Sequence, residues 1–216
     1  MYAPIGVFGL LTYTVGTYGA EVLLPLLKLI MVMFVACIIH ICIIYLPCIK
    51  YSGVPLKKFF KELTSTILVA FSSASSAAAL SSNLQSVQRL GASRPVSSFL
   101  IPLGNTINMD GTAIYMGVCS IFAATFFGID LTFDKQILIV IIAMLASVGT
   151  MGVPGAGVIM ISMVFTQVGI PLEAIALIAG IDRVLDMMRT TLNVLGDATG
   201  ALTVSKAEND MHPIQE

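Results

Sequence analysis

The segment Gly180 to Asp197, "GIDRVLDMMRTTLNVLGD", constrains the fold more than any other part of this chain. It holds three carboxylates, two guanidiniums and one asparagine, yet the sequence on both sides of it is almost entirely apolar. The chain of 216 residues is 57% hydrophobic and only 11% charged, whereas soluble domains are about 25% charged. This composition predicts a membrane protein, in which a charged segment must face protein, water or ligand rather than lipid.

Charge and residue pattern exclude two classes of protein. The formal net charge is −1 and the basic residues form no patch of the kind that phosphate binding needs, so we expect no nucleic-acid partner. An intramembrane protease would need a carboxylate pair, such as Asp110 with Asp182 or Asp186, that shares one proton. Arg189 would instead hold both carboxylates ionised, so we expect that the chain is not an enzyme.

Apolar runs and basic loops predict how the chain enters the bilayer. Leu29 to Pro47 is long enough to cross a hydrocarbon core of about 30 Å. Ile5 to Thr17 is apolar but short, and we interpret it as the end of another span. The loops Lys50–Lys61 and Arg89–Arg94 are basic, and the positive-inside rule places both in the cytoplasm of a multi-pass protein of the cell membrane.

Two segments are interrupted in a way that predicts re-entrant hairpins. Residues 55–90 leave from and return to the cytoplasmic side, and their centre, the serine-rich stretch 72–76, is too polar for a lipid-facing span. Residues 134–169 consist of two apolar halves that are each too short to cross the bilayer, separated by four glycines and Pro154. The loops around this second hairpin are mostly acidic, which favours the outer side.

The remaining segments complete the predicted organisation. A span at about residues 96–128 is broken at "NMDGT", residues 108–112, and the charged segment belongs to a last span at about 172–206. We divide the chain into two N-terminal spans (1–48), a transport core (49–206) and a polar tail (207–216). The predicted fold is an all-α membrane protein with two opposed re-entrant hairpins and a broken helix. Such inverted repeats are typical of secondary transporters, whose binding site lies near the bilayer midplane where broken backbone meets polar side chains.

The polar residues of the last span share one face of a helix. With about 3.6 residues per turn, a stripe roughly 80° wide collects five of them: Asp182, Asp186, Arg189, Asn193 and Asp197. One interpretation is internal pairing of Arg189 with Asp186 and Asp182. The other is ligand binding, since an arginine fork holds a carboxylate bidentately and an aspartate one turn away accepts an ammonium group. Asp110, Asn108 and the carbonyls at helix breaks add hard oxygen atoms that suit alkali cations.

Three motifs carry a resemblance to a known family. They are "PLGNTINMDGT" (102–112), "GTMGVPGAG" (149–157) and "LDMMRTTLNVLGD" (185–197). Together, and in this order, they closely resemble the sodium- or proton-coupled dicarboxylate/amino-acid symporters of the glutamate transporter family. "YAPIGVF" at Tyr2 to Phe8 is similar to the start of the family's fifth span. The resemblance covers nearly the whole chain. Family members have further spans before this point, which supply most of a homotrimeric scaffold, so we interpret the chain as a fragment, the product of a split gene or a degraded form of an intact parent protein.

The resemblance also implies site residues. Arg189 matches the arginine that grips the substrate's side-chain carboxylate, and Asp186 matches the acceptor of its amino group. The other implied substrate contacts are Ser76, Thr112, Val153, Gly157, Thr190 and Asn193. One implied sodium site comprises Gly104, Asn108, Asn193 and Asp197. A second comprises Thr106, Ser147, Val148 and Thr150, and Asn108 with Asp110 form part of a third.

The implied function is sodium-coupled symport of an acidic amino acid or dicarboxylate, such as aspartate or glutamate. Arg189 favours the acidic substrate, because family members that carry neutral amino acids tend to lose it, and Asp197 favours sodium over protons. Ala74 stands where many relatives have an arginine, and Arg183 is a partial substitute for it. Two alternatives stay open: a truncated fragment that binds substrate without transporting it, and a proton-coupled symporter of C4-dicarboxylates or neutral amino acids.

Overall fold

The computed structural model of the protein describes residues 3–150 and 152–213, so Tyr2 and Met151 of the motifs above lie outside the described residues. The described part is helical throughout, which confirms the all-α expectation. Its α-helices are α1 (Ala3–Tyr18), α2 (Leu23–His40), α3 (Leu46–Ser52), α4 (Leu56–Ser73), α5 (Ser76–Arg89), α6 (Arg94–Ile107), α7 (Asp110–Phe126), α8 (Phe133–Val148), α9 (Ala156–Val168), α10 (Glu173–Ala179) and α11 (Asp182–Ala207). A 3₁₀ turn, η1 (Ala20–Val22), precedes α2, and a π-helical turn, η2 (Ile41–Tyr45), joins α2 to α3.

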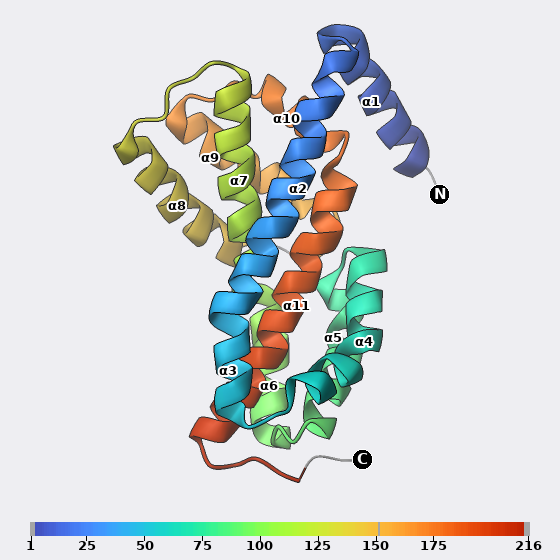
Figure 1. Cartoon of the computed structure of the whole chain (residues 1–216), viewed down its shortest axis with the longest axis vertical. Coiled ribbons are helices and arrows are strands. Elements are labelled where there is room, and N and C mark those ends of the chain that lie inside the picture. The colour runs from blue at the N-terminus through green and yellow to red at the C-terminus, as the bar shows by residue number, and fades with distance from the viewer. Residues whose placement is uncertain (1–2, 151, 214–216) are drawn as a thin grey trace.

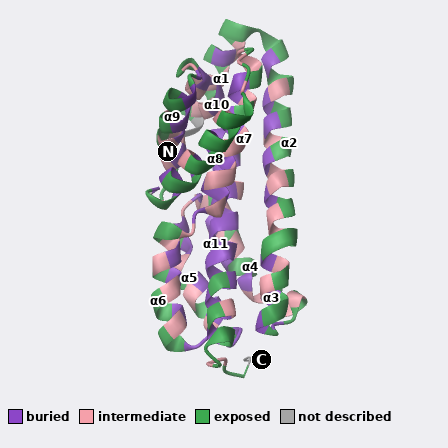
Figure 2. Ribbon diagram, turned by 90° about the vertical axis from the view of Figure 1, so that its left-hand side faces the viewer, coloured by how far each residue is buried: buried purple, intermediate pink, exposed green. Residues whose placement is uncertain are grey.

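Helix α11 forms the centre of the molecule. It runs along the long axis, with α2 and α3 beside it, α4, α5 and α6 around its lower half, and α7 to α10 around its upper half (Figure 1). Almost every residue from Leu185 to Thr199 is buried, and the side view shows α11 as a buried core between the outer helices (Figure 2). A helix that is covered all round can hold charged side chains only where its neighbours supply partners.

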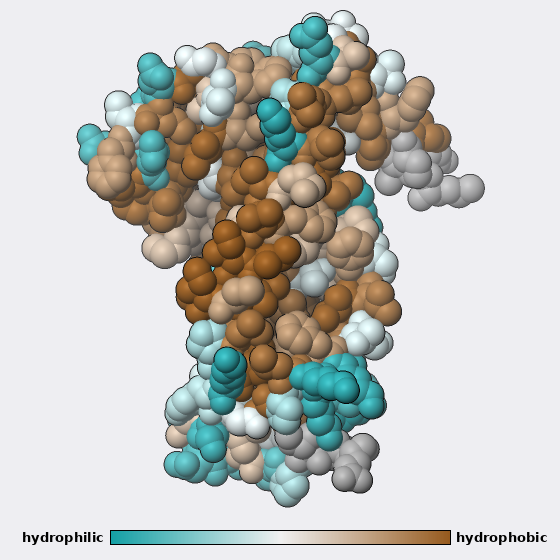
Figure 3. Space-filling model, viewed as in Figure 1, coloured by the Kyte–Doolittle hydropathy of each residue, from teal (hydrophilic) through white to brown (hydrophobic). Residues whose placement is uncertain are grey.

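Two long apolar helical stretches are long enough to cross a membrane: Ala20–Ser52 and Arg94–Phe126. The first is longer at both ends than the predicted span Leu29–Pro47. The second contains a break, because α6 ends at Ile107 and α7 begins at Asp110. Large apolar side chains on the outside of the first stretch, such as Leu24, Met31 and Ile43, are more than half exposed. They form an apolar belt between hydrophilic ends (Figure 3), which is the surface that a bilayer requires.

Two helix pairs bring their turns to the middle of the molecule from opposite ends (Figure 1). In the first pair, α4 and α5 are joined by Ala74 and Ser75, which we call the first tip. Ala74 adopts a left-handed conformation with φ 51°, and Ser75 caps α5 by accepting a hydrogen bond from the Ala78 N–H at 3.2 Å. In the second pair, α8 and α9 are joined by residues 149–155, which we call the second tip.

The last predicted span, at 172–206, differs from the observed helices. The chain forms a short helix α10, breaks at Gly180 and Ile181, and only then enters α11. At the break α1 approaches closely: a Cβ atom on Gly180 would lie 3.0 Å from the Leu11 side chain. The apolar sequence around Gly180 does not reveal this contact between distant segments.

Candidate functional site

The five polar residues of the predicted stripe are all buried along α11. Their exposed fractions are 8% or less: Asp182, Asp186, Arg189, Asn193 and Asp197. The two tips and the break between α6 and α7 lie against this stripe. The candidate site is therefore a junction of three chain segments around one helix.

The two tips contact each other directly. The Ser75 hydroxyl donates to the Gly152 carbonyl at 2.9 Å, and the Ala77 N–H donates to the same oxygen at 3.4 Å. Ser76 is buried and packs against Gly152, whereas Val153 is 44% exposed. The two tips thus meet although Ser75 and Gly152 are 77 positions apart in the sequence, and the predicted substrate contacts Ser76 and Val153 are neighbours of the bonded residues.

Arg189 uses only part of its guanidinium within the protein. Its Nε and Nη2 donate to Oδ1 of Asp186 at 3.1 and 2.5 Å, so the internal pairing considered from the sequence is present for Asp186. The guanidinium carbon lies 5.2 Å from the centre of the Tyr115 ring. Nη1 is buried and has no hydrogen-bond partner among the described residues. Nη1 faces Gly157, where a Cβ atom would overlap it.

Asp186 ties the second tip to α11. Its Oδ2 accepts a hydrogen bond from the Gly155 N–H at 2.8 Å, and its Oδ1 also accepts one from the Thr190 hydroxyl at 3.2 Å. Gly155 has φ 79°, a conformation that a residue with a Cβ atom rarely adopts. The carboxylate thus holds a backbone turn and a guanidinium together, and an ammonium group would compete for the same oxygens.

Asn193 joins α11 to the start of α7. Its side-chain oxygen accepts from the Gly111 N–H at 2.8 Å, and its amide nitrogen lies 3.3 Å from the Thr112 hydroxyl. These contacts bring together two predicted substrate residues, Thr112 and Asn193. Of the first N–H groups of α7, that of Gly111 reaches Asn193, whereas those of Thr112 and Ala113 donate to the Met109 carbonyl.

Oxygen atoms gather on the opposite side of the same break. The Asn108 amide donates to Oδ1 of Asp197 at 2.9 Å, and a Cβ atom on Gly104 would overlap this carboxylate. Asp110 accepts a hydrogen bond from the Tyr45 hydroxyl at 2.8 Å and lies 3.1 Å from Nε2 of His40. Carboxylate, amide and carbonyl oxygens are hard donors, so this set fits an alkali cation.

The second predicted sodium set is not joined by hydrogen bonds in the described part of the chain. The hydroxyl of Thr106 donates to the Leu103 carbonyl within α6, and those of Ser147 and Thr150 donate to carbonyls of α8. Val148 is 48% exposed. Because the prediction for these residues concerns their backbone carbonyls, it stays a prediction.

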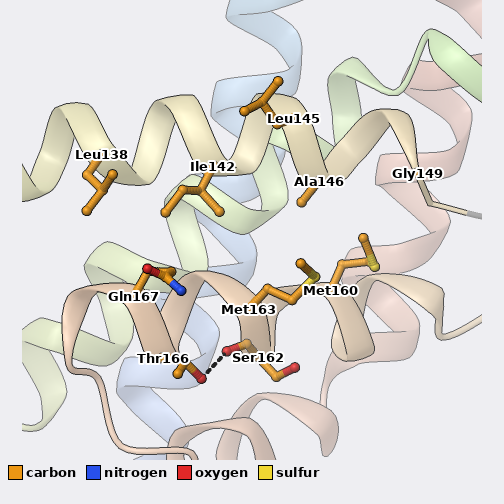
Figure 4. Close-up of a pocket in the computed structure, with 10 residues that line it drawn as sticks. All are labelled: Leu138, Ile142, Leu145, Ala146, Gly149, Met160, Ser162, Met163, Thr166 and Gln167. Carbon is orange, nitrogen blue, oxygen red and sulfur yellow. Dashed lines mark hydrogen bonds between the residues drawn. The ribbon is translucent and has the colours of Figure 1, made fainter.

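The largest groove lies away from these polar residues. It has a volume of about 790 Å³ and runs between α8 and α9, where Leu138 and Ile142 face Met163 and Gln167 (Figure 4). Gly149 lines it from the second tip. The groove is therefore a largely apolar surface of the second helix pair.

Comparison with known proteins identifies the family. Residues 1–207 match the sodium:dicarboxylate symporter family. The chain belongs to this family. Since it is a family of transporters, the expectation that the chain is not an enzyme is confirmed.

Relatives in the family carry names that point to acidic substrates. The chain is 37% identical over 207 residues to a proton/sodium-glutamate symport protein of Geobacillus stearothermophilus, covering 96% of this chain and 49% of the relative. It is 36% identical over 208 residues to a proton/glutamate-aspartate symporter of Escherichia coli, covering 96% of this chain and 48% of the relative. It is 32% identical over 209 residues to a C4-dicarboxylate transport protein of Bacillus subtilis, covering 96% of this chain and 50% of the relative. The chain spans about half the length of these relatives.

Several side chains of this symporter-family site were not singled out from the sequence. The Tyr115 hydroxyl donates to Oδ1 of Asp182 at 2.8 Å, and the Tyr115 ring packs against the guanidinium of Arg189, so Asp182 fixes the ring on which the guanidinium lies. His40, at the end of α2, and Tyr45, in η2, contact Asp110. Tyr115 follows Thr112 by three residues and so shares its helix face, which is a signal that the sequence contains. No sequence signal links Tyr45 to Asp110, because the contact depends on how two distant helices pack.

Proposed function

We propose that the chain forms the substrate- and cation-carrying core of a sodium-coupled secondary active symporter for an acidic amino acid or dicarboxylate, such as aspartate or glutamate. The observation that carries this proposal is Nη1 of Arg189, a buried cationic donor without a partner in the described residues. Leaving such a donor unpaired costs about 1–3 kcal/mol or more. A carboxylate on a ligand would pair with it, and the names of the relatives, which include glutamate, aspartate and C4-dicarboxylate, support the acidic class.

Each end of the substrate has a proposed partner. Arg189 holds the side-chain carboxylate and Asp186 accepts the ammonium group, while backbone N–H groups at the tips bind the α-carboxylate. The remaining proposed contacts are Ser76, Thr112, Val153, Gly157, Thr190 and Asn193. The hydrogen bond from the Gly155 N–H to Asp186 supports a gating role for the second tip. A ligand whose ammonium group binds the Asp186 carboxylate would compete with this bond and so change how the second tip is held.

Sodium is the proposed coupling ion. The oxygen set at Gly104, Asn108, Asn193 and Asp197 would hold one ion, and Asp110 with Asn108 would contribute to another. The proposed second site consists of Thr106, Ser147, Val148 and Thr150. Because the relatives' names include both proton and sodium, proton coupling is the alternative that an ion-replacement experiment must exclude.

The proposed architecture follows from the same motifs. The pairs α4–α5 and α8–α9 are re-entrant hairpins that enter from opposite membrane faces, and the segment at 96–128 is a broken span. Residues 1–48 form two N-terminal spans, residues 49–206 the transport core and residues 207–216 a polar tail. We propose a homotrimer for an intact parent protein. Because the chain spans about half of its relatives, a fragment that binds substrate without transporting it is the second candidate.

The first test is substrate binding. L-aspartate is titrated into the purified chain by calorimetry, in sodium and in choline buffer, with Arg189→Ala and with Arg89→Ala as a control. Arg89 is an exposed arginine far from the tips, 4.0 Å from Glu62. We expect sodium-dependent binding that Arg189→Ala abolishes and Arg89→Ala leaves unchanged. Binding that survives Arg189→Ala would contradict the proposed role of the guanidinium. Uptake into vesicles then separates a symporter from a fragment that only binds.

A further inference from the structure

Arg183, in the first turn of α11, contacts the end of α4, directly before the first tip. Its side chain is exposed, and its Nη2 and Nη1 donate to the carbonyls of Ser72 and Ser73 at 2.7 and 3.2 Å. The contact joins residues that are 110 or more positions apart in the sequence. The fork geometry of a guanidinium allows one side chain to hold two neighbouring carbonyls, which a lysine ammonium does less well.

The two carbonyls belong to the last turn of α4, where they have no partner within the helix. A cation at this end also interacts favourably with the helix dipole. The turn that follows is strained, because Ala74 adopts φ 51° without being glycine. Arg183 thus binds the end of α4 that leads directly into the first tip.

Contacts continue from the first tip to the second. Ser75, directly after the strained residue, donates its hydroxyl to the Gly152 carbonyl at 2.9 Å. The second tip returns to α11 through the bond from the Gly155 N–H to Asp186. Arg183 and Asp186 lie three residues apart on α11, so the helix holds both tips and the tips hold each other. Asp186 also accepts hydrogen bonds from Arg189, so these contacts lead to the side chain whose Nη1 is unpaired among the described residues.

We propose that Arg183 is a positioning residue of the substrate site: it fixes the first tip so that Ser75 meets Gly152 and both tips stay closed around Arg189. The inference rests on the proposed function, and it adds a residue that contacts no substrate atom. Replacement of Arg183 alters no side chain that is proposed to contact the substrate. It removes the hydrogen bonds that hold the end of α4, and so it frees the first tip. Substrate affinity should therefore fall because the closed arrangement is less populated.

The test measures the arrangement of the tips and substrate affinity separately. Nitroxide labels are attached at Leu68→Cys on α4 and Ile159→Cys on α9, which are 63% and 72% exposed, in a variant whose native cysteines are replaced by alanine. Pulsed electron resonance gives the distance distribution between the labels in lipid vesicles. L-aspartate binding is measured on the unlabelled proteins, for the wild type, Arg183→Ala, Arg183→Lys and the control Arg89→Ala.

We expect Arg183→Ala to broaden the distance distribution and to weaken aspartate binding about tenfold, as for loss of a charge-assisted hydrogen bond. Arg183→Lys should be intermediate and Arg89→Ala unchanged. Adding Ser75→Ala to Arg183→Ala should cost little more than either change alone, because both act on one contact chain. An unchanged distance distribution in folded Arg183→Ala would overturn the inference. If the wild type binds no aspartate, the proposed function fails, yet the distance measurement still decides whether Arg183 holds the tips.

Discussion

The guanidinium of Arg189 has two edges with different surroundings. One edge, Nε and Nη2, is paired with Asp186, whereas Nη1 on the other edge is buried beside Gly157 without a partner in the described chain. Internal pairing and ligand binding, which the sequence presents as alternatives, are therefore compatible in one side chain. The pair keeps the buried charge tolerable, because removal of one partner from a buried ion pair costs about 3–5 kcal/mol.

Gly157 leaves room for Nη1 of Arg189 because it has no side chain, so the addition of one methyl group tests the site. In Gly157→Ala the new Cβ atom would overlap Nη1 and lie 3.2 Å from the Tyr115 ring. The guanidinium must move, and we expect aspartate binding to weaken at least about tenfold, since about 1.4 kcal/mol suffices for that change. Titration calorimetry measures the effect.

Gly117→Ala is the matched control. Gly117 lies within α7 and has no atom within 4 Å of the position that its Cβ would take. Alanine in a helix interior is favoured over glycine by about 0.5–1 kcal/mol, so this variant should bind normally and be at least as stable as the wild type. Equal binding by Gly157→Ala and Gly117→Ala would show that the space at Gly157 does not govern the site.

At the scale of helices, local sequence signals predict most of the elements. Glycine, serine and proline clusters mark the two tips, and Asn108 lies in the gap between α6 and α7. The π-helical turn η2 and the break before α11 were not expected from the sequence, although Pro47, which lacks a backbone N–H, follows η2 by two residues and is a local signal for irregular helix geometry. The polar stripe is predictable from helix periodicity, but its partners are not: the Tyr115–Asp182 and Ser75–Gly152 contacts join residues 67 and 77 positions apart.

The second tip carries a prediction about the helix pair α8–α9. Gly155 combines a left-handed backbone with the hydrogen bond to Asp186, so Gly155→Ala strains the turn by about 1–2 kcal/mol and disturbs this contact. Gly169, with φ 78°, ends the same helix α9 away from the site and serves as the control. We expect both alanine variants to lose stability in a thermal unfolding assay, and only Gly155→Ala to lose aspartate binding as well. Loss of binding in Gly169→Ala too would mean that strain anywhere in α9, rather than the tip contact, controls the site.

At the scale of the whole molecule, the distribution of charge along the long axis agrees with an insertion across a bilayer. The basic loops around Lys57 and Arg89 lie at one end, where Arg89 approaches Glu62 and the C-terminal segment bonds back to Gly91. The loop before α8, which contains Asp130, and the first turn of α8, which contains Asp134, lie toward the other end (Figure 1). Between the two ends, hydrophobic side chains cover much of the face shown in Figure 3, and large apolar side chains on the outside of α2 and α8 are exposed.

This arrangement predicts that the two helix pairs begin on opposite sides of the membrane. The native cysteines are removed, and a single cysteine is placed in the first turn of each pair, as Lys57→Cys in α4 or Asp134→Cys in α8. Lys57→Cys should react with an impermeant maleimide only in inside-out vesicles. Asp134→Cys should react only in right-side-out vesicles or intact cells. Both positions are exposed in the structure, so access depends on the membrane rather than on burial. Arg94→Cys, on the second basic loop, should follow Lys57→Cys, because charge bias orients both loops to the cytoplasm. Labelling of Lys57→Cys and Asp134→Cys from the same side would contradict opposed entry and, with it, the inverted repeat on which alternating access at the Arg189 site depends.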